Sequence, residues 1–501
     1  MKVRGLYCTA LLVAMAFATS ADAADVKALK KQAKKQIVAG EFADAISTVK
    51  EIGAAGGEDA IDALFDLGTI EQGLTEKLYE AVAVEMVRQS GVVPNLLERY
   101  NKVKSKPDFR DRVFITDIMT RVNNPEARAA LIQFLDDGSD FVRGAAVSGL
   151  AKSKHADGVL PLIKLLEELS KKKRDVLYDD VRDALYDLTG EDYELIEDWK
   201  NWWEAVQGSF DPKKLDTAGK TGVRKKKRGE EPEFFEVPVT SKHIVFVIDS
   251  SESMKYVMKT DIPGLARGDG SDSGQGSGGG QMTPEDQKLA EFWTRMEMAK
   301  RELQKVVKSL DPKTMFNIVQ FNTQVDRFKK QSVPANPQSK KDAEKYIESI
   351  KRRNFTATMD ALVEAFSADP KTNAIFFLSD GIPSKDGKSP DSTSPILDRV
   401  FDMNRFRKIK IHTFGFFDKA YPNGEPYDDL AKANSFLREL AAKSGGKFTD
   451  IKVDPSCTPE QPYGPPKKKG KEKDKEGDGK EGDGKDGDGK TIELPLAPTW
   501  F

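Results

Sequence analysis

Residues 244–253 read Ile-Val-Phe-Val-Ile-Asp-Ser-Ser-Glu-Ser, five apolar residues in a row followed by carboxylate and hydroxyl side chains. An unbroken apolar run of this length predicts a strand buried on both faces, as in a parallel sheet. A second such run, at 374–378, ends in Ser379-Asp380-Gly381. Buried strands that alternate with helices indicate a doubly wound α/β domain.

The other strands and helices of this predicted domain lie around these two runs. We expect strands at 316–321, 409–414 and 447–451, and helices at 293–310, 356–366 and 435–444. The domain is predicted to span residues 240–455 and to carry a Gly-, Ser- and Asp-rich insertion at 256–290.

Two carboxylates, Asp249 and Asp380, each follow a buried strand. Both therefore fall at the carboxyl edge of the predicted sheet, where doubly wound folds bind their ligands. Carboxylates that meet there repel each other unless a cation lies between them. Ser251 and Ser253 stand at alternate positions, so an extended loop points both hydroxyls the same way as Asp249. Oxygen ligands with few charges suit Mg²⁺, or Mn²⁺, better than zinc.

Three motifs in this region resemble the metal ion-dependent adhesion site of von Willebrand factor type A domains. In chain order they are Asp249-x-Ser251-x-Ser253, Thr356 four residues before Asp360-Ala361-Leu362, and Asp380-Gly381. The resemblance covers residues 241–454 and implies that Ser251, Ser253 and Thr356 touch one metal directly. It implies that Asp249 and Asp380 act mainly through water. A coordination position then stays open for a carboxylate of a protein partner.

Two features depart from that family's usual pattern. Glu252 stands where the family usually has Gly, and we expect its side chain to point to solvent. The insertion at 256–290 separates the first motif from the first helix, where the family normally has a short connection. We interpret Asp360 as an acidic residue at the favourable N-terminal end of a helix and not as a ligand.

Residues 24–206 show helical periodicity throughout. The pair Val142-Arg143 recurs 39 residues later as Val181-Arg182, and a spacing near 40 with two helices per unit is typical of helical repeats. The sequence here resembles the HEAT-repeat family, most clearly at 123–190. Three Trp residues at 199, 202 and 203 are interpreted as a cap over the last repeat.

The remaining segments predict export and flexible connections. Residues 1–23 have the basic start, apolar run and small residues of a signal peptide, and no later stretch is long and apolar enough to span a membrane. Residues 207–239 are predicted to be a charged linker. The low-complexity tail at 456–501 has a Lys-, Gly- and Asp-rich middle without apolar residues and is predicted to be disordered.

Charge and histidine content limit the classes of function. Lys and Arg total 79 against 81 Asp and Glu, a balance that argues against nucleic acid as a partner. The 3 His residues follow no nucleophile motif, which argues against an enzyme. We predict an exported adaptor that binds an acidic group of a protein partner through one divalent metal. A structural envelope component and a metal-dependent enzyme remain the alternatives.

Overall fold

The computed structural model describes residues 23–172, 174–215, 231–259, 262, 282–381, 383–384, 392–417 and 427–463. These residues form two compact units. The helical unit takes in the described residues up to 215, together with Phe401–Arg407. The α/β unit takes in the other described residues from 231 onwards.

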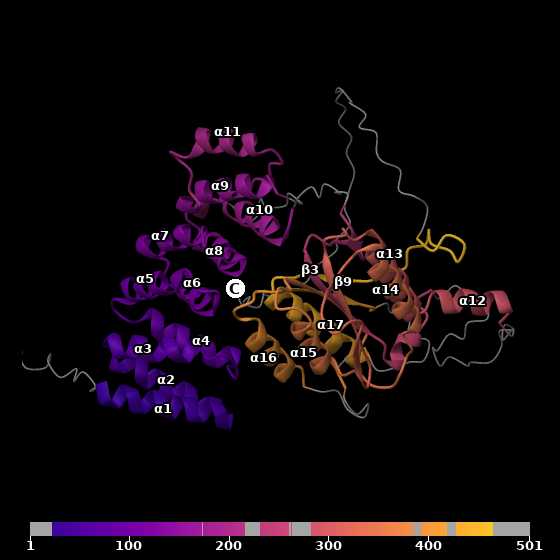
Figure 1. Ribbon diagram of the computed structural model, residues 1–501, viewed down its shortest axis with the longest axis horizontal. Helices are drawn as coiled ribbons and strands as arrows, with labels where there is room; N and C mark the ends of the chain where they lie inside the picture. The colour runs from indigo at the N-terminus through magenta and orange to yellow at the C-terminus, as the bar shows by residue number, and fades with distance from the viewer. Residues whose placement is uncertain are drawn as a thin grey trace, which may run out of the picture. The chain divides into compact units, whose positions relative to one another are not determined.

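The helical unit is built from α-helices joined by short turns, and Figure 1 shows them stacked in pairs. They are α1 (Ala23–Ala39), α2 (Phe42–Ala55), α3 (Gly57–Gly68), α4 (Glu76–Val87), α5 (Val92–Val103), α6 (Arg110–Val122), α7 (Pro125–Phe134), α8 (Asp140–Ser153), α9 (Val159–Ser170), α10 (Val176–Thr189) and α11 (Ile196–Val206). Consecutive helices from α1 to α10 pack as pairs, and α2, α4, α6, α8 and α10 pack on one another as an inner layer. This arrangement confirms the predicted helical repeats.

Hydrogen bonds between neighbouring pairs repeat at a nearly constant sequence separation. Lys30 bonds to Asp66, which lies 36 residues away, and the Tyr79 hydroxyl donates to Asp117, 38 residues away. Since these bonds begin at α1, the repeats start well before residue 123, where the sequence pattern becomes clear.

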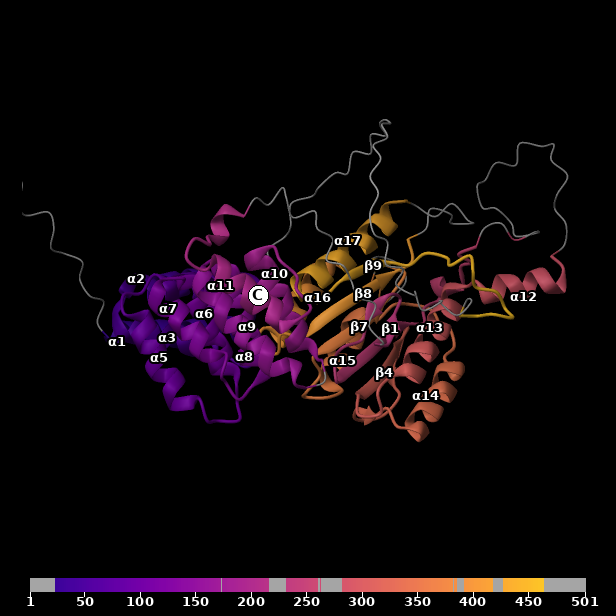
Figure 2. The ribbon, with the colours of Figure 1, turned by 90° about the horizontal axis from the view of Figure 1, so that it is seen from above.

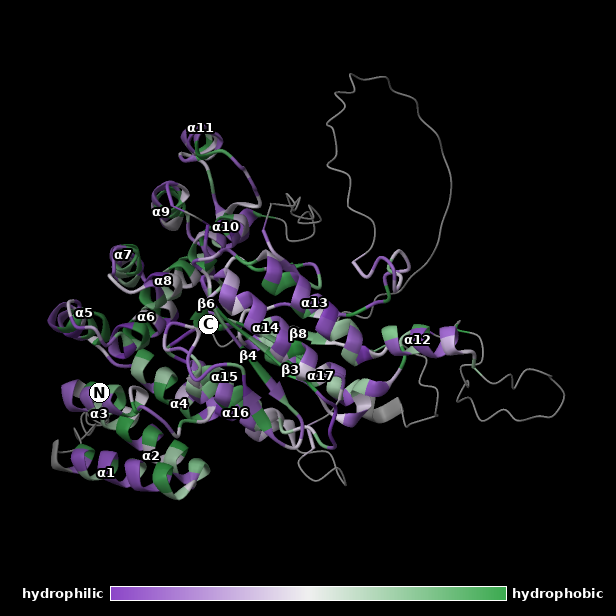
Figure 3. Ribbon diagram, turned by 45° about the vertical axis from the view of Figure 1, so that its right-hand side comes forward, coloured by the Kyte–Doolittle hydropathy of each residue, from purple (hydrophilic) through white to green (hydrophobic). Residues whose placement is uncertain are grey.

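Local sequence explains where these helices begin and end. The Asn124 side chain accepts a hydrogen bond from the Ala127 amide at 2.7 Å, and Pro125 occupies the first turn, so α7 begins there. Gly190 ends α10 with a φ of 76°, a conformation that favours glycine. The amphipathic pattern is visible in Figure 3, where many helices of this unit have a hydrophobic and a hydrophilic side.

The Trp residues near the end of the array pack as predicted. Trp199 is fully buried and donates its indole N–H to the Tyr193 carbonyl at 3.0 Å. The rings of Trp202 and Phe210 pack edge to face, with centroids 5.3 Å apart, and α11 packs against α9. This aromatic cluster therefore covers the last helix pair.

The α/β unit contains a seven-stranded mixed sheet with helices on both faces, as Figure 2 shows. Its elements are β1 (Glu233–Phe234), β2 (Val237–Pro238), β3 (His243–Asp249), α12 (Pro284–Phe292), α13 (Arg295–Ser309), β4 (Met315–Phe321), β5 (Val325–Arg327), β6 (Val333–Pro334), α14 (Pro337–Ser349), α15 (Thr358–Ser367), β7 (Ala374–Leu378), α16 (Thr393–Asn404), β8 (Lys410–Gly415), α17 (Tyr427–Lys443) and β9 (Phe448–Asp450). The last residues of α16, 401–404, are grouped with the helical unit. The strand order is β5-β4-β3-β7-β8-β9. Strands β4, β3, β7, β8 and β9 are parallel, which confirms the doubly wound fold.

Strand β3 is buried on both faces, as its apolar run predicts. Alternate residues Ile244, Phe246 and Ile248 join the apolar core that includes α13 and α14. Val245 and Val247 are equally buried and point to the opposite face of the sheet, where α15 packs against β3 and β4.

The α/β unit begins earlier than predicted. Residues 231–239 were expected to belong to a charged linker, but β1 and β2 form an antiparallel hairpin there. Phe234 is fully buried, with its ring centroid 5.3 Å from that of Phe246 and 4.9 Å from that of Phe414. The hairpin is therefore part of the core, and only residues 216–230 of the predicted linker lie outside the described residues.

The predicted insertion is closed at its base by a short antiparallel bridge, which we call the neck. Val257 pairs with Thr294, and the Met258 amide donates to the Trp293 carbonyl at 2.9 Å. Helix α12 begins inside the predicted insertion and runs past its predicted end at residue 290, and α13 follows the neck. Residues 1–22, 263–281 and 464–501 lie outside the described residues, so the signal peptide, the role of the insertion and the disordered tail stay predictions. Across the described helices, none has the length and hydropathy needed to cross a membrane.

Candidate metal centre

The candidate site lies where the strand order of the sheet reverses. The chain passes from β3 to β4 on one side and then returns to β7 on the other side of β3. In doubly wound sheets this leaves a crevice beyond the carboxyl ends of the two strands, where ligands bind. Asp249 is the last residue of β3, and Asp380 comes two residues after β7.

The Asp249 carboxylate is completely buried and held in a fixed orientation. One of its oxygens accepts a hydrogen bond from the Ser251 amide at 2.8 Å. The other accepts one from the Ser379 hydroxyl at 2.6 Å. Ser379 follows β7 directly, so the neighbouring strand helps to position the carboxylate at the end of β3.

The two serines of the first motif form a chain of oxygens that leads to Asp380. The hydroxyls of Ser251 and Ser253 lie 3.0 Å apart, and Ser253 donates to Asp380 at 2.7 Å. These contacts join loops that lie 127 residues apart in the sequence. The structure thus brings together four of the predicted ligands, Asp249, Ser251, Ser253 and Asp380.

The fifth predicted ligand, Thr356, lies in a loop that is hydrogen-bonded to the first motif. The Arg353 amide donates to the Ser250 carbonyl at 2.9 Å, and the Ala357 amide donates to the Asn322 carbonyl at 2.9 Å. Asn322 in turn donates from its side chain to the Ser250 hydroxyl at 2.9 Å. Thr356 itself is buried and pairs through its backbone with Ser384.

Burial and like charge disfavour two free carboxylates at this position. Burial, and then the negative charge of Asp380, raise the pKa of Asp249 to about 7, although hydrogen bonds from Ser379 and Ser251 oppose the change. A positive charge in the crevice would relieve this repulsion, which is the role that a metal ion plays between carboxylates.

One such positive charge is already present, and the motifs did not predict it. A guanidinium nitrogen of Arg295 lies 2.6 Å from Asp380, and both side chains are buried. Arg295 is separated from the first motif by the insertion, so no local spacing links the two. The one available signal was its place on the apolar stripe of α13, together with Met298 and Ala299.

The spacing of the hydroxyls fits an octahedral Mg²⁺ ion. Ligands at neighbouring corners of an octahedron with bonds of about 2.1 Å lie about 3.0 Å apart. The oxygens of Ser251 and Ser253 have this separation of 3.0 Å. Among the residues that the structure describes, no group of three His, Cys, Asp or Glu could hold a metal.

Other residues considered from the sequence have positions that do not call for a ligand role. Glu252 is exposed and pairs with Lys255 at 3.5 Å, as expected of a side chain in solvent. Asp360 is in the first turn of α15, the position predicted for it. His243 is at the opposite end of β3, where its ring lies 2.8 Å from the carboxylate of Asp369.

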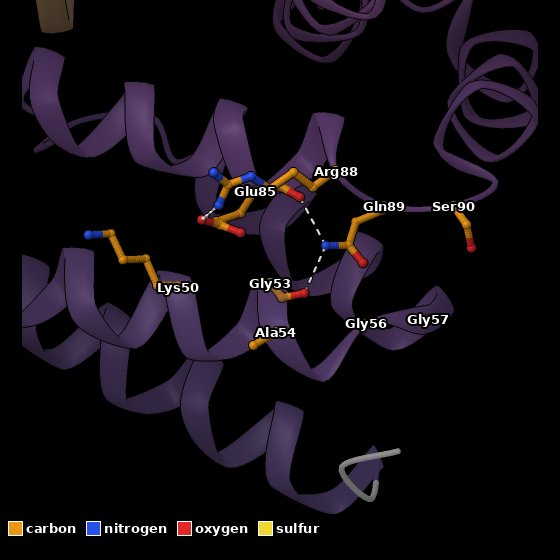
Figure 4. A pocket seen from close by; sticks show the side chains of 9 residues that line it. All are labelled: Lys50, Gly53, Ala54, Gly56, Gly57, Glu85, Arg88, Gln89 and Ser90. Carbon is orange, nitrogen blue, oxygen red and sulfur yellow. Dashed lines mark hydrogen bonds and ion pairs between the residues drawn. The ribbon is translucent and has the colours of Figure 1, made fainter. Parts of the chain in front are cut away.

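A separate hollow lies in the helical unit, and Figure 4 shows its lining. It has a volume of about 740 Å³ and is lined by Lys50, Gly53, Ala54, Gly56, Gly57, Glu85, Arg88, Gln89 and Ser90. Several of its polar groups bond to one another. Arg88 forms a salt bridge with Glu85 at 2.7 Å, and the side-chain amide of Gln89 donates to the Gly53 carbonyl at 3.0 Å. These bonds stabilise the helix ends and leave the metal centre as the stronger candidate site.

One curated human relative matches part of this chain. The human "von Willebrand factor A domain-containing protein 3B" is 35% identical over 146 residues, which are 29% of this chain. The match covers only 10% of the length of that relative.

Solved structures that match part of this chain include a von Willebrand factor type A protein from Catenulispora acidiphila, 16% identical. That match covers 42% of this chain and 38% of the other, with a TM-score of 0.28. The PilB minor pilin from Streptococcus sanguinis is 14% identical over 44% of this chain and 59% of its own, with a TM-score of 0.29.

A family model described as the von Willebrand factor type A domain matches residues 290–448. This range begins after the Asp249-x-Ser251-x-Ser253 motif, but β3, which carries the motif's first residue, pairs with β4 and β7 inside the matched range. The match, the human relative and the doubly wound sheet together show that this chain contains a von Willebrand factor type A domain.

Proposed function

We propose that the α/β unit binds one Mg²⁺ or Mn²⁺ ion and uses it to bind a carboxylate of a protein partner. The ligands in this proposal are Asp249, Ser251, Ser253, Thr356 and Asp380. The observation that carries it is the continuous set of oxygens from Ser251 through Ser253 to Asp380, beside the buried Asp249. These oxygens stand at the edge of the sheet where such folds bind ligands.

Each residue has a distinct part in this binding. Ser251, Ser253 and Thr356 would touch the ion directly, and Asp249 and Asp380 would act mainly through water. Bound there, the ion would supply a positive centre with a place for one outside oxygen. Ser379 and the Ser251 amide keep Asp249 in position, so its carboxyl group is oriented before the ion arrives.

For the whole chain, the proposal is an exported adaptor. Two features support it: the signal-like sequence at 1–23 and the stacked helix pairs, which offer an extended second binding surface. A structural role in the cell envelope is the alternative, and fractionation into soluble and envelope pools distinguishes the two.

We do not propose an enzyme. Ser250, the serine next to the crevice, already donates its hydroxyl to the Phe321 carbonyl at 3.0 Å and receives a bond from Asn322. A nucleophile needs a base partner in hydrogen-bond reach. A hydrolase screen with and without Mg²⁺ tests this, and turnover that depends on the metal would revive the enzyme class.

Calorimetry tests the metal site directly. We expect one Mn²⁺ or Mg²⁺ per full-length chain, and we expect Asp249→Ala to abolish binding. Asp369→Ala is the matched control, because it removes another buried carboxylate, which lies in the connection before β7 and contacts His243 at the opposite end of β3. Equal metal affinity in the wild type and in Asp249→Ala would refute the assignment.

Partner binding is tested by capture from an envelope extract, in Mg²⁺ and again in chelator. We expect Asp380→Ala to abolish capture, because its carboxylate helps to form the metal site. Deletion of 465–501 should change affinity by less than about tenfold, or about 1.4 kcal/mol, because most of that tail offers neither a strong net charge nor an apolar anchor. The reverse pattern would move the interaction surface to the tail, and a second deletion of 494–501 alone then tests its apolar end.

A further inference from the structure

We propose that Arg295 is a resident counter-cation of the metal centre, which competes with the divalent ion for Asp380 and lowers the affinity of the site. This inference rests on the proposed function, since it concerns the same crevice. It adds a residue that neither the motifs nor the family resemblance supplies, and it assigns that residue a role in setting metal affinity.

The two oxygens of Asp380 have different partners. One accepts the hydroxyl hydrogen of Ser253 at 2.7 Å, and so belongs to the chain of proposed ligands. The other accepts a guanidinium N–H of Arg295 at 2.6 Å. Arg295 is therefore in direct contact with the carboxylate that the ion, or its bound water, would use.

The position of Arg295 is fixed on the protein side. It is the first residue of α13, and its amide donates to the Tyr256 carbonyl at 3.0 Å. Its guanidinium carbon lies 5.3 Å from the centre of the Tyr256 ring. With only 3% of its side chain exposed, Arg295 has little freedom to turn into solvent. The charge is thus built into the crevice, beside the neck of the insertion.

The sum of charges shows why this residue opposes the metal. Asp249 and Asp380 carry two negative charges when both are ionised, and Arg295 cancels one of them. With Arg295 present, a divalent ion that enters the crevice is attracted by a net negative charge of one and is repelled by the nearby guanidinium. Without Arg295, the ion would be attracted by two negative charges. Because charges repel more strongly where water is excluded, this difference weakens metal binding.

The same charge stabilises the crevice when metal is absent. A buried carboxylate without a cation is costly, and Arg295 supplies the cation for Asp380. Removal of the guanidinium should therefore have two opposite effects. The metal-free protein becomes less stable, while the metal-bound form gains, because the ion no longer shares Asp380.

The test compares full-length variants by calorimetry with MnCl₂ and by thermal unfolding with and without the metal. We expect Arg295→Met to bind Mn²⁺ about tenfold more tightly than the wild type, or better still. Its melting temperature should fall in chelator and rise more steeply than that of the wild type as Mn²⁺ is added. Arg295→Lys, which keeps the charge, should stay close to the wild type.

Arg301→Met is the matched control, because it removes a guanidinium from the same helix. Arg301 lies 3.6 Å over the Phe292 ring and donates to the Phe292 carbonyl, away from Asp380. This variant should leave Mn²⁺ affinity unchanged. If Arg295→Met alone fails to fold, Arg295→Gln provides a second neutral side chain that can still bond to Asp380.

The outcomes separate this inference from the proposed function. If the wild type binds Mn²⁺ and the neutral variants bind it equally or more weakly, the counter-cation role is overturned. The assignment of the metal site then still stands. Neutral variants that fold only with Mn²⁺ support the role. Neutral variants that fail to fold even with Mn²⁺ show a purely structural Arg295 and overturn it. If neither the wild type nor any variant binds Mn²⁺, both proposals fall.

Discussion

Asp249 and Asp380 lie in one buried crevice, but among the described residues only Asp380 has a positively charged side chain beside it. Asp380 has the guanidinium of Arg295 beside it. Asp249 has only hydrogen-bond donors, from Ser251 and Ser379, and its pKa is raised to about 7 by burial and by Asp380. The charge on Asp249 therefore costs stability whenever no metal is bound.

A change of Asp249 to Asn should stabilise the metal-free protein while it abolishes metal binding. Asparagine keeps the size of the side chain and removes the charge that burial disfavours. We expect a gain of about 1–3 kcal/mol in unfolding free energy at pH 8 in chelator. Urea unfolding measures it. Asp369→Asn, which loses its charge beside His243, should show no such gain. A loss of stability in Asp249→Asn would show that the carboxylate is stabilised by groups other than a metal.

His412 provides a second test, through pH. Burial, and then the charges of Lys410 and Lys447, lower its pKa to about 3, and its Nδ1 accepts the Lys447 amide at 3.1 Å. Because the unfolded chain protonates near pH 6.5 and the folded chain only near 3, stability is full above pH 6.5 and falls as the pH drops towards 3. The loss from pH 7 to pH 5 should be about 2 kcal/mol. In His412→Gln this part of the pH dependence should vanish, and an unchanged slope would contradict the assignment.

The site was predictable as far as its residues stand next to recognisable strands. Asp249 and Asp380 could be placed because each follows a strand whose burial is evident from its composition. Ser251 and Ser253 follow from alternation in an extended loop. Arg295 could not be placed, because its contact with Asp380 joins residues 85 apart in the sequence, and such a contact depends on tertiary packing alone.

The helical array contains a buried ion pair that ties several of its helices together. Arg112, on α6, lies 2.9 Å from Asp137, and both side chains are almost completely buried. Asp137 also accepts the Tyr100 hydroxyl of α5 at 2.8 Å. The Arg112 guanidinium donates to the carbonyl of Val103, at the end of α5, and to those of Lys106 and Asp108, in the connection between α5 and α6. These hydrogen bonds and the ion pair join helices that also pack through apolar side chains.

A change of Asp137 to Ala should destabilise the array strongly, because it leaves a buried guanidinium without its carboxylate. We expect a loss of about 3–5 kcal/mol in unfolding free energy, measured by urea unfolding monitored by helical circular dichroism. Asp108→Ala is the control, since Asp108 pairs with Arg110 at the surface and should contribute less than about 1 kcal/mol. Similar losses in the two variants would show that burial is not the deciding factor.

Long, strongly patterned segments were predicted well, and short or weakly patterned ones were not. The expected helix at 293–310 corresponds to α13, and the expected strand at 316–321 to β4. Strands β5 and β6 were missed because they have three and two residues, too few for a pattern. The β1–β2 hairpin was missed because it adjoins a highly charged stretch, and only its packing against the sheet reveals its place in the core.

The chain divides into two compact units, so we expect them to unfold in separate transitions. The core of the α/β unit draws its residues from Phe234 onwards. Phe234→Ala should remove about 3–5 kcal/mol from the unfolding free energy of this unit and leave the helical transition in place. Mg²⁺ should raise the same α/β transition. Scanning calorimetry of the full chain measures both effects. A single transition that shifts with Phe234→Ala and with Mg²⁺ would show that the chain unfolds as one cooperative body.

The neck at Val257 and Thr294 has a consequence for how this domain tolerates change over evolution. Because the bridge and the Met258–Trp293 hydrogen bond close the inserted stretch on itself, β3 and α13 meet in the same geometry whatever number of residues joins them. Closing a longer flexible loop costs little, about 0.6 kcal/mol for each doubling of its length. We therefore expect changes in the length or sequence of this stretch to leave the sheet undisturbed, so that it can vary more freely than the strands and helices on either side of the neck.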